Sequence, residues 1–247
     1  MTIPTIQAGT AVCDYRILEC IHIGARSEIY RAEALRGGQK VILKLPAAGQ
    51  DPSEAELRLG SEHNMLLSLR SQRVVQTLGL SRWDGLPVLA LDNGKLGTDP
   101  KDCRSLRAHM DSGVLGGCGS PDRLALLIRI FQSLVRAIDD VHKADLIHKH
   151  VSLDNVLYSL HSDAVMLIDF GICARGTSFG LGNADARAIE GTLDGLSPEQ
   201  SGLIHRGIDW RSDYYSLGAL MYWLCTGQPL FDEPDRISLV HAHIART

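Results

Sequence analysis

The chain has 247 residues, of which 45% are hydrophobic and 22% are charged, and its formal net charge is -4 at pH 7. This length and composition are typical of a globular protein with a substantial buried core, in one large domain or two lobes. The slight negative charge argues against nucleic acid or an anionic membrane surface as the main partner. No apolar run in the sequence approaches the roughly 20 residues that span a bilayer, so we expect no membrane insertion.

The cysteines and the N-terminus indicate the compartment. The six cysteines are scattered without a C-x-x-C pair, which suits a reducing environment better than a disulfide framework or a zinc site. Residues 1–13 lack the basic and apolar regions of a signal peptide and show no periodicity, so we interpret them as a leader. We therefore expect a cytoplasmic protein.

Residues 14–92 are predicted to form an antiparallel sheet with one helix. Turn signals at Gly37-Gly38 and Asp84-Gly85 each join two strand-like segments. The predicted strands are residues 15–21, 29–32, 40–45, 74–80 and 87–91.

The residues between the first two strands, 22–27, read HIGARS. A glycine such as Gly24 lets backbone amides approach a phosphate group without a Cβ in the way. A plain β-hairpin turn explains this short segment equally well, so the loop alone does not indicate a nucleotide.

The helix in this half is predicted over residues 53–70, with Ser53 as its N-cap. Glu62 precedes one apolar position by four residues and another by seven, which places it beside the buried face. Its carboxylate is then able to pair with Lys44, near the end of the third strand. The alternative is a solvated Glu62, with another glutamate or none in that role. The apolar positions of the helix are Leu57, Met65, Leu66 and Leu69.

A segment rich in Asp, Gly and Pro follows residue 92, and we place a boundary between two lobes there. The predicted division is therefore a leader at 1–13, one lobe at 14–92 and a second at 93–247. We expect the second lobe to be mainly helical.

Two long helices are predicted in the second lobe. Ser120 and Pro121 open the first as N-cap and first helical residue, and it runs to about Lys143. The second, residues 212–226, is apolar nearly all round, which is typical of a helix buried on every side. The first helix carries one apolar stripe, formed by Leu124, Leu127, Phe131, Leu134, Ile138 and Val141.

Residues 146–171, LIHKHVSLDNVLYSLHSDAVMLIDFG, hold two short loops separated by a hairpin-like pair of strands. His148, Lys149 and Asn155 fit the kinase catalytic-loop pattern H-R-D-L-x-x-x-N, with lysine for arginine, and residues 169–171 read D-F-G. Asn155 and Asp169, one from each loop, are fourteen residues apart.

With these motifs the chain resembles the eukaryotic-like Ser/Thr protein kinase domain over about residues 14–247. The late segments EGTLDGLSPEQSG and IDWRSDYYSLGALMYWLCTGQPLF are similar to the N-terminal kinase-like domain of large bacterial multidomain signalling proteins. The resemblance implies an α+β, bilobal protein-kinase-like fold: a five-stranded antiparallel N-lobe with one main helix, and a mainly helical C-lobe lacking its last helices. It also implies ATP and Mg²⁺ as cofactors, and a protein substrate or regulated downstream domains as partners.

The resemblance also implies roles for individual residues. Lys44 would hold phosphates and Glu62 would hold Lys44, while Asn155 and Asp169 would bind magnesium through oxygen. Asp213 would anchor the catalytic loop, and Glu199 would pair with an arginine in the last part of the lobe. The glycine-loop position is Gly24, and the adenine-contacting positions are Ile21, Ile29, Ile42 and Leu157.

His150 is the main departure, because it stands where the family has the catalytic Asp. That Asp accepts the proton of the substrate hydroxyl. An imidazole, with an unperturbed pKa of about 6.5, can accept a proton but is bulkier than a carboxylate and adds positive charge when protonated. We favour a pseudokinase that binds ATP over an active Ser/Thr kinase with His150 as base. A nucleotide-free interaction scaffold is the third interpretation, and the presence of Lys44, Glu62, Asn155 and Asp169 argues against it.

Overall fold

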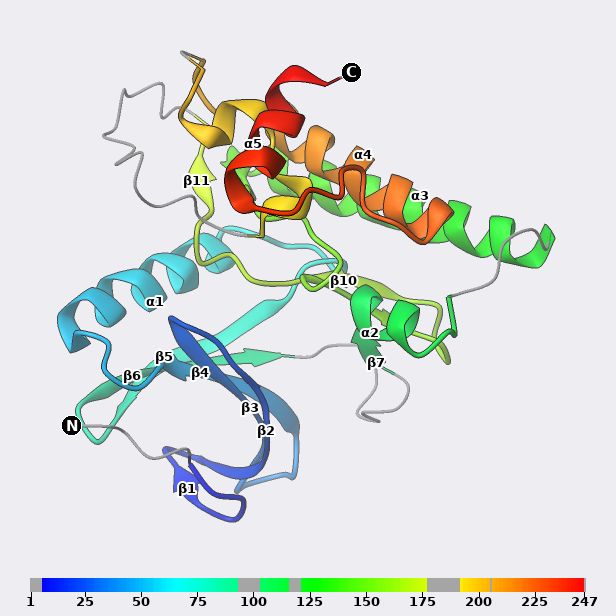
Figure 1. Ribbon diagram of the computed structural model, residues 1–247. Coiled ribbons are helices and arrows are strands. Elements are labelled where there is room, and N and C mark those ends of the chain that lie inside the picture. Colours follow the sequence, from blue (N-terminus) through cyan, green and yellow to red (C-terminus); the bar gives the residue numbers. More distant parts are fainter. Residues whose placement is uncertain (1–5, 93–102, 116–120, 177–191, 205, 247) are drawn as a thin grey trace. The chain divides into compact units, whose positions relative to one another are not determined.

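The computed structural model describes residues 6–92, 103–115, 121–176, 192–204 and 206–246. The chain divides into two compact units, Met1–Thr98 and Asp99–Thr247. The first is an antiparallel sheet with one main helix and the second is mainly helical (Figure 1), so the expected α+β class is confirmed. The predicted linker after Asp92 and the N-cap at Ser120 lie outside the described residues.

The sheet of the first unit has six antiparallel strands in the order β1-β2-β3-β4-β6-β5. Five of them are the predicted strands, with slightly different ends. The sixth, β1, lies within the supposed leader and pairs Ala11 with Arg16 and Val12 with Tyr15. A two-residue strand is too short to show a period, which is why the sequence pattern did not reveal it. The strands are β1 (Ala11–Val12), β2 (Tyr15–Ile23), β3 (Ser27–Ala34), β4 (Lys40–Pro46), β5 (Gln76–Trp83) and β6 (Leu86–Asp92).

One face of this sheet carries the core of the first unit. Side chains from β1 to β4 and β6 pack there, with Ile6 from the segment before β1. The backbone N–H of Ile6 donates to the hydroxyl of Tyr30, 3.1 Å away, and that hydroxyl donates to the carboxylate of Glu28. Burial, reinforced by the hydrogen bond to Glu28, raises the pKa of Tyr30. Residues of the supposed leader are therefore part of the fold.

Helix α1 (Pro52–Leu67) packs against β5 and β6 (Figure 1). Its N-cap is Asp51, whose carboxylate accepts hydrogen bonds from the backbone N–H groups of Ser53 and Glu54, both at 2.9 Å. The prediction of Ser53 as N-cap is wrong, because Pro52 already occupies the first helical position. The predicted apolar face was also partly wrong, since Leu57 is 77% exposed. The buried positions are Ala55, Leu59, Glu62 and Leu66.

The second unit contains four helices and two small sheets among its described residues. The sheets have the orders β10-β9-β7 and β11-β8. The helices are α2 (Leu106–Asp111), α3 (Pro121–Lys143), α4 (Arg211–Thr226) and α5 (Arg236–Ala245). The strands are β7 (Cys103–Ser105), β8 (Leu146–Ile147), β9 (Val156–Ser159), β10 (Val165–Leu167) and β11 (Ala174–Arg175).

The bounds of α3 agree with the prediction, but its buried face is rotated from the predicted stripe. Leu124 is 60% exposed and Phe131 is 39% exposed, whereas Ile130 and Ala137 are fully buried. A wide apolar stripe on a helix does not reveal which of its edges faces the core.

Helix α4 is not buried on every side, which corrects that prediction. Tyr214 and Tyr222 are 40% and 45% exposed, while Asp213 and Ser216 face inward. The buried side of α4 thus carries polar groups as well as apolar ones, and the Ser216 hydroxyl donates to the Gly195 carbonyl at 2.7 Å.

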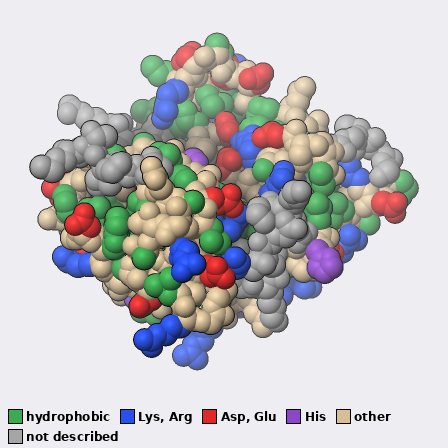
Figure 2. Space-filling model, turned by 90° about the horizontal axis from the view of Figure 1, so that it is seen from below, with side chains coloured by type: hydrophobic (Ala, Val, Ile, Leu, Met, Phe, Trp, Pro, Cys, Tyr) green, Lys and Arg blue, Asp and Glu red, His purple; other side chains and the backbone are tan. Residues whose placement is uncertain are grey.

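One face of the surface can be followed in a space-filling view. On the face drawn in Figure 2, hydrophobic side chains are interspersed with Lys and Arg and with Asp and Glu. Within the part of the chain that the structure describes, every helix is too short or too polar to cross a bilayer.

The cap at Asp51 gives a first prediction. Asp51→Ala should lower the free energy of unfolding by about 1 kcal/mol, because two backbone N–H groups lose their acceptor. Urea unfolding of both proteins measures this difference. Ser53→Ala is the matched control and should change stability little, and a larger loss in the control than in Asp51→Ala would contradict the assignment.

Candidate functional site

Strand pairing brings the two loops of residues 146–171 together. Val156 of β9 pairs with Leu167 of β10, so Asn155 and Ile168 are neighbours, and the Ile168 N–H donates to the Asn155 carbonyl at 2.9 Å. At the other ends of the loops, Ile147 of β8 pairs with Ala174 of β11. Both loops are therefore held at both ends by the same two strand pairs.

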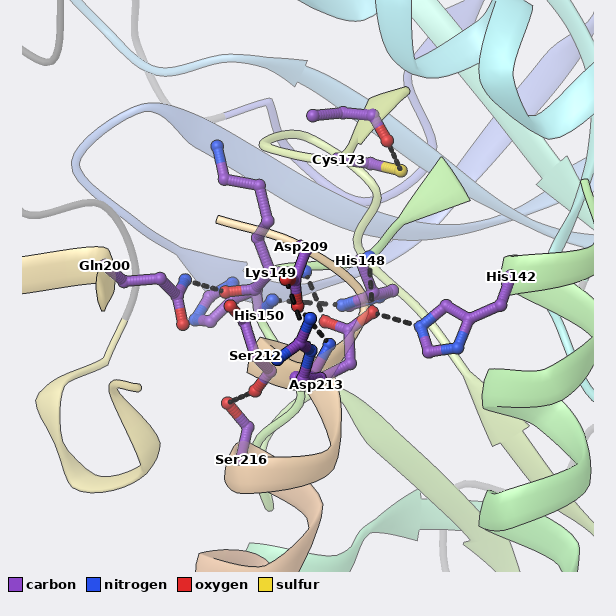
Figure 3. Close-up of polar contacts among 12 residues, drawn as sticks. His142, His148, Lys149, His150, Cys173, Gln200, Asp209, Ser212, Asp213 and Ser216 are labelled. Carbon is purple, nitrogen blue, oxygen red and sulfur yellow. Dashed lines mark hydrogen bonds and ion pairs between the residues drawn. The ribbon is translucent and has the colours of Figure 1, made fainter. Parts of the chain in front are cut away.

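The catalytic loop is anchored by Asp213 of α4, which is fully buried. One carboxylate oxygen accepts the backbone N–H of Lys149 at 2.7 Å, and the other accepts the backbone N–H of His148 at 2.9 Å. The second oxygen also accepts from Nε2 of His142, which points toward it from α3 at 2.8 Å (Figure 3). These bonds confirm the anchoring role predicted for Asp213.

Each of the two loops contains one non-glycine residue in an unfavourable backbone conformation. Lys149 has φ of 65° and Asp169 has φ of 64°, the left-handed region that non-glycine residues seldom adopt. The Asp213 carboxylate holds the Lys149 N–H, and the side chain of Gln200 donates to the Lys149 carbonyl at 2.7 Å. Strained residues of this kind persist where surrounding contacts hold them and are concentrated at functional sites.

His148 connects the two loops through its ring. Nε2 donates to the Ile168 carbonyl at 3.1 Å, Nδ1 accepts the His150 N–H at 3.2 Å, and the ring packs edge-on against Phe170. This bonding requires a neutral imidazole, because Nδ1 must keep its lone pair. Burial lowers the pKa of His148 to about 4, in agreement with the neutral form.

The two predicted magnesium ligands lie in these loops. Asn155 is buried and its Nδ2 donates to the His150 carbonyl at 3.0 Å, which leaves Oδ1 as the oxygen that can serve a ligand. The side chain of Asp169 is 33% exposed. Their role as metal ligands stays a prediction.

The ring of His150 bridges two segments. Its Nε2 accepts the backbone N–H of Thr192 at 3.1 Å, and its Nδ1 lies 3.4 Å from Oδ2 of Asp169. Because Nε2 accepts a hydrogen bond, the proton of the neutral ring sits on Nδ1, the nitrogen nearer the Asp169 carboxylate. The only lone pair of the neutral ring is thus used within the protein.

In the first unit, Lys44 and Glu62 form a buried ion pair. The Lys44 ammonium donates to both carboxylate oxygens of Glu62, at 2.8 and 3.1 Å, and the two side chains are 8% and 1% exposed. The alternative of a solvated Glu62 is therefore wrong. Ile29 pairs with Lys44 across β3 and β4, and Ile42 precedes Lys44 by two residues, so all three share one face of the sheet.

Gly24 lies in a tight connection between β2 and β3, where its N–H donates to the Ser27 carbonyl at 2.9 Å. A Cβ on Gly24 would come 3.0 Å from Nε2 of His22, an exposed side chain that can rotate away, so local packing does not require glycine here. Ile21, just before this connection, is 46% exposed. Leu157, in β9 of the second unit, is half-buried. A phosphate-binding role of Gly24 stays a prediction, as do the adenine contacts.

Three residues of the site were not identified from the sequence. Thr192, Gln200 and His142 hold His150, Lys149 and Asp213 by the bonds described above. Each lies between about 40 and 70 residues from its partner, so local patterns carry no signal for them.

Glu199 also has a partner that differs from the expected arginine. The Ser212 hydroxyl, at the start of α4, donates to its carboxylate.

The family model and the relatives that match this chain all belong to protein kinases. The protein kinase domain family matches residues 15–247. The serine/threonine-protein kinase PknB of Mycolicibacterium smegmatis is 28% identical over 238 residues, which cover 93% of this chain and 35% of that protein. A probable serine/threonine-protein kinase of Clostridium perfringens is 26% identical over 231 residues, covering 93% and 31%. The chain therefore spans about a third of the length of these relatives.

The buried His148 gives a prediction for the pH dependence of stability. Between pH 6.5 and 4 the unfolded chain binds a proton at this side chain that the folded chain does not, so the free energy of unfolding falls as pH falls through this window. The loss at this side chain should total about 3 kcal/mol.

Urea unfolding of the wild-type protein and of His148→Gln between pH 7.5 and 4.5 measures this effect. The variant, which is less stable at pH 7.5, should lose less further stability on acidification. Parallel curves for the two proteins would contradict the assignment.

Proposed function

This chain belongs to the protein kinase family, and from that premise we propose that it is an ATP- and magnesium-binding signalling domain with little or no phosphoryl transfer. The observation that carries the proposal is the bonding of His150, which stands at the position of the catalytic Asp. Its Nε2 accepts the Thr192 N–H, so the lone pair that would take the proton of a substrate hydroxyl is already used, and Nδ1 lies 3.4 Å from Asp169.

The proposal of nucleotide binding rests on features within each unit. In the first, the buried pairing of Lys44 with Glu62 supports a phosphate-binding role, because the pair holds the Lys44 ammonium in the place that the family uses for phosphates. In the second, Asn155 and Asp169 offer the amide and carboxylate oxygens that magnesium prefers. When bound, magnesium neutralises phosphate charge.

The reason for weak transfer is chemical as well as geometric. The family's Asp accepts the proton of the substrate hydroxyl and orients that hydroxyl. For His150 to do so, Nε2 would have to release the Thr192 N–H, and a protonated ring would then add positive charge beside Lys149. A well-placed acid-base group contributes about 10²–10⁴-fold to the rate, which is the size of the deficit we expect.

An active Ser/Thr kinase is the alternative, supported by the relatives, whose names describe serine/threonine-protein kinases. In that case His150 would act as the base after leaving Thr192. The partners proposed for this chain are a protein substrate or further domains of a longer protein that it regulates. A cytoplasmic location is part of the same proposal.

Nucleotide binding is tested by thermal unfolding with ATP and magnesium. At a nucleotide concentration 100 times Kd, Tm should rise by about 5–10 °C, since ligand that binds only the folded state stabilises it. Asp169→Asn should abolish most of this rise. Asp163→Asn, the same substitution in the turn between β9 and β10, is the matched control and should keep it. No shift with the wild-type protein at millimolar ATP would leave only an interaction scaffold.

Phosphoryl transfer is tested with radiolabelled ATP and a generic protein substrate, scoring labelling of the chain itself as well. The wild-type protein should be near background, and His150→Asp should raise the rate roughly 10²–10⁴-fold by restoring the proton acceptor. His150→Asn has the shape of Asp without its charge and should stay near background. Robust transfer by the wild-type protein would overturn the proposed loss of activity.

A further inference from the structure

The turn between β2 and β3, residues 24–26, is held by side chains from outside these two strands. Nε2 of Gln50 donates to the Ala25 carbonyl at 3.2 Å, and Nη2 of Arg58 donates to the Arg26 carbonyl at 2.6 Å. Gln50 lies in the connection between β4 and α1, and Arg58 lies in the second turn of α1. Two successive carbonyls of the turn thus each have a side-chain donor.

Backbone hydrogen bonds reinforce this attachment. The N–H of Ala47, just after β4, donates to the same Arg26 carbonyl at 3.2 Å, and within the turn the Gly24 N–H donates to the Ser27 carbonyl. A hydrogen bond from a charged donor is roughly twice as strong as a neutral one. Among these contacts, the one from Arg58 therefore contributes most to holding the turn.

Arg58 shares one side of α1 with Glu62. The two residues are four positions apart, so their side chains are neighbours on the helix surface. Glu62 accepts both hydrogen bonds from the Lys44 ammonium, and Arg58 donates to the turn. One side of one helix therefore sets the positions of both Lys44 and the turn.

Lys44 and this turn are the two elements of the first unit to which the family assigns phosphate contacts. The family has glycine at three positions of the loop, whereas residues 22, 24 and 27 of this chain are His, Gly and Ser. Residues with a Cβ restrict the backbone more than glycine does. A loop that is fixed before its ligand arrives loses less conformational entropy on binding.

We propose that Arg58 is a positioning residue for phosphate binding, which holds the turn through the Arg26 carbonyl where its backbone meets the phosphates of a nucleotide. Gln50 supports it at the neighbouring carbonyl. Arg58 acts through the turn and not by touching the ligand. The inference rests on the proposed function, because it takes ATP as the ligand, and it goes further by making α1 the element that orders the loop.

The attachment itself is tested without nucleotide, by hydrogen–deuterium exchange of the backbone N–H groups of residues 24–27. In Arg58→Ala these groups should exchange about fivefold faster than in the wild-type protein, because the turn opens more often. Arg82→Ala is the matched control, since Arg82 pairs with α1 through Glu56, at 3.2 Å, instead of with the turn. It should leave exchange in the turn unchanged.

The role in phosphate binding is tested by NMR titration with ATP and magnesium, and separately with adenosine, which lacks the phosphates. Arg58→Ala should raise the Kd of ATP about fivefold to tenfold and change that of adenosine by less than about twofold, because only the phosphates meet the turn. Arg82→Ala removes the same charge and should leave both Kd values as in the wild-type protein.

Gln50→Ala separates positioning from charge, because glutamine is neutral. It should raise the Kd of ATP about twofold to threefold. Arg58→Lys, whose ammonium can also donate to a carbonyl, should recover part of the affinity that Arg58→Ala loses. Circular dichroism checks folding, and Gln50→Ala, which lies outside the helix, provides the same comparison if Arg58→Ala does not fold.

Three results would overturn the proposal: unchanged exchange in Arg58→Ala, equal weakening of ATP and adenosine, or an effect on ATP that Gln50→Ala does not share. Failure of the proposed function looks different. A wild-type protein that binds no ATP would overturn that function and with it the phosphate role of Arg58, whereas ATP binding that Arg58→Ala leaves unchanged would overturn this inference alone.

Discussion

The buried carboxylate of Asp213 is the interaction on which the catalytic loop depends. A carboxylate removed from water is costly unless hydrogen bonds compensate it, and Asp213 receives three. Two of the donors are successive backbone N–H groups, of His148 and Lys149, so the charge directly stabilises the left-handed backbone at Lys149. The remaining contacts of the loop build on this turn.

The replacement of the catalytic Asp by His150 changes which hydrogen bonds the catalytic loop can make at this position. A carboxylate in this place has lone pairs to spare after one hydrogen bond, whereas a neutral imidazole has a single acceptor and a single donor. The acceptor, Nε2, takes the Thr192 N–H, and the donor, Nδ1, lies 3.4 Å from the Asp169 carboxylate. The ring therefore links two segments of the protein at the position where the family orients a substrate.

Paired charges occur in both units, buried in the first and partly exposed in the second. Lys44 and Glu62 are buried together in the first unit, and Arg107 in the second is held by two carboxylates and an indole. Removing one partner of a buried ion pair destabilises a protein by more than the pair had stabilised it, because the remaining charge is left buried without a partner. In each unit, carboxylates of the same unit thus hold a cationic side chain, Lys44 or Arg107, in a fixed position.

The sequence alone determined the five main strands, the bounds of α3 and the two motif loops, because periodicity, turn residues and residue type act over a few neighbouring positions. It did not determine the cap at Asp51, the exposure of Leu57 or the pairing of β1, since these depend on which surface each element packs against. The partner of His150, forty-two residues away, was likewise decided only by the tertiary structure. A hydrogen bond between distant segments exists only once the chain has closed around it, so local patterns cannot encode it.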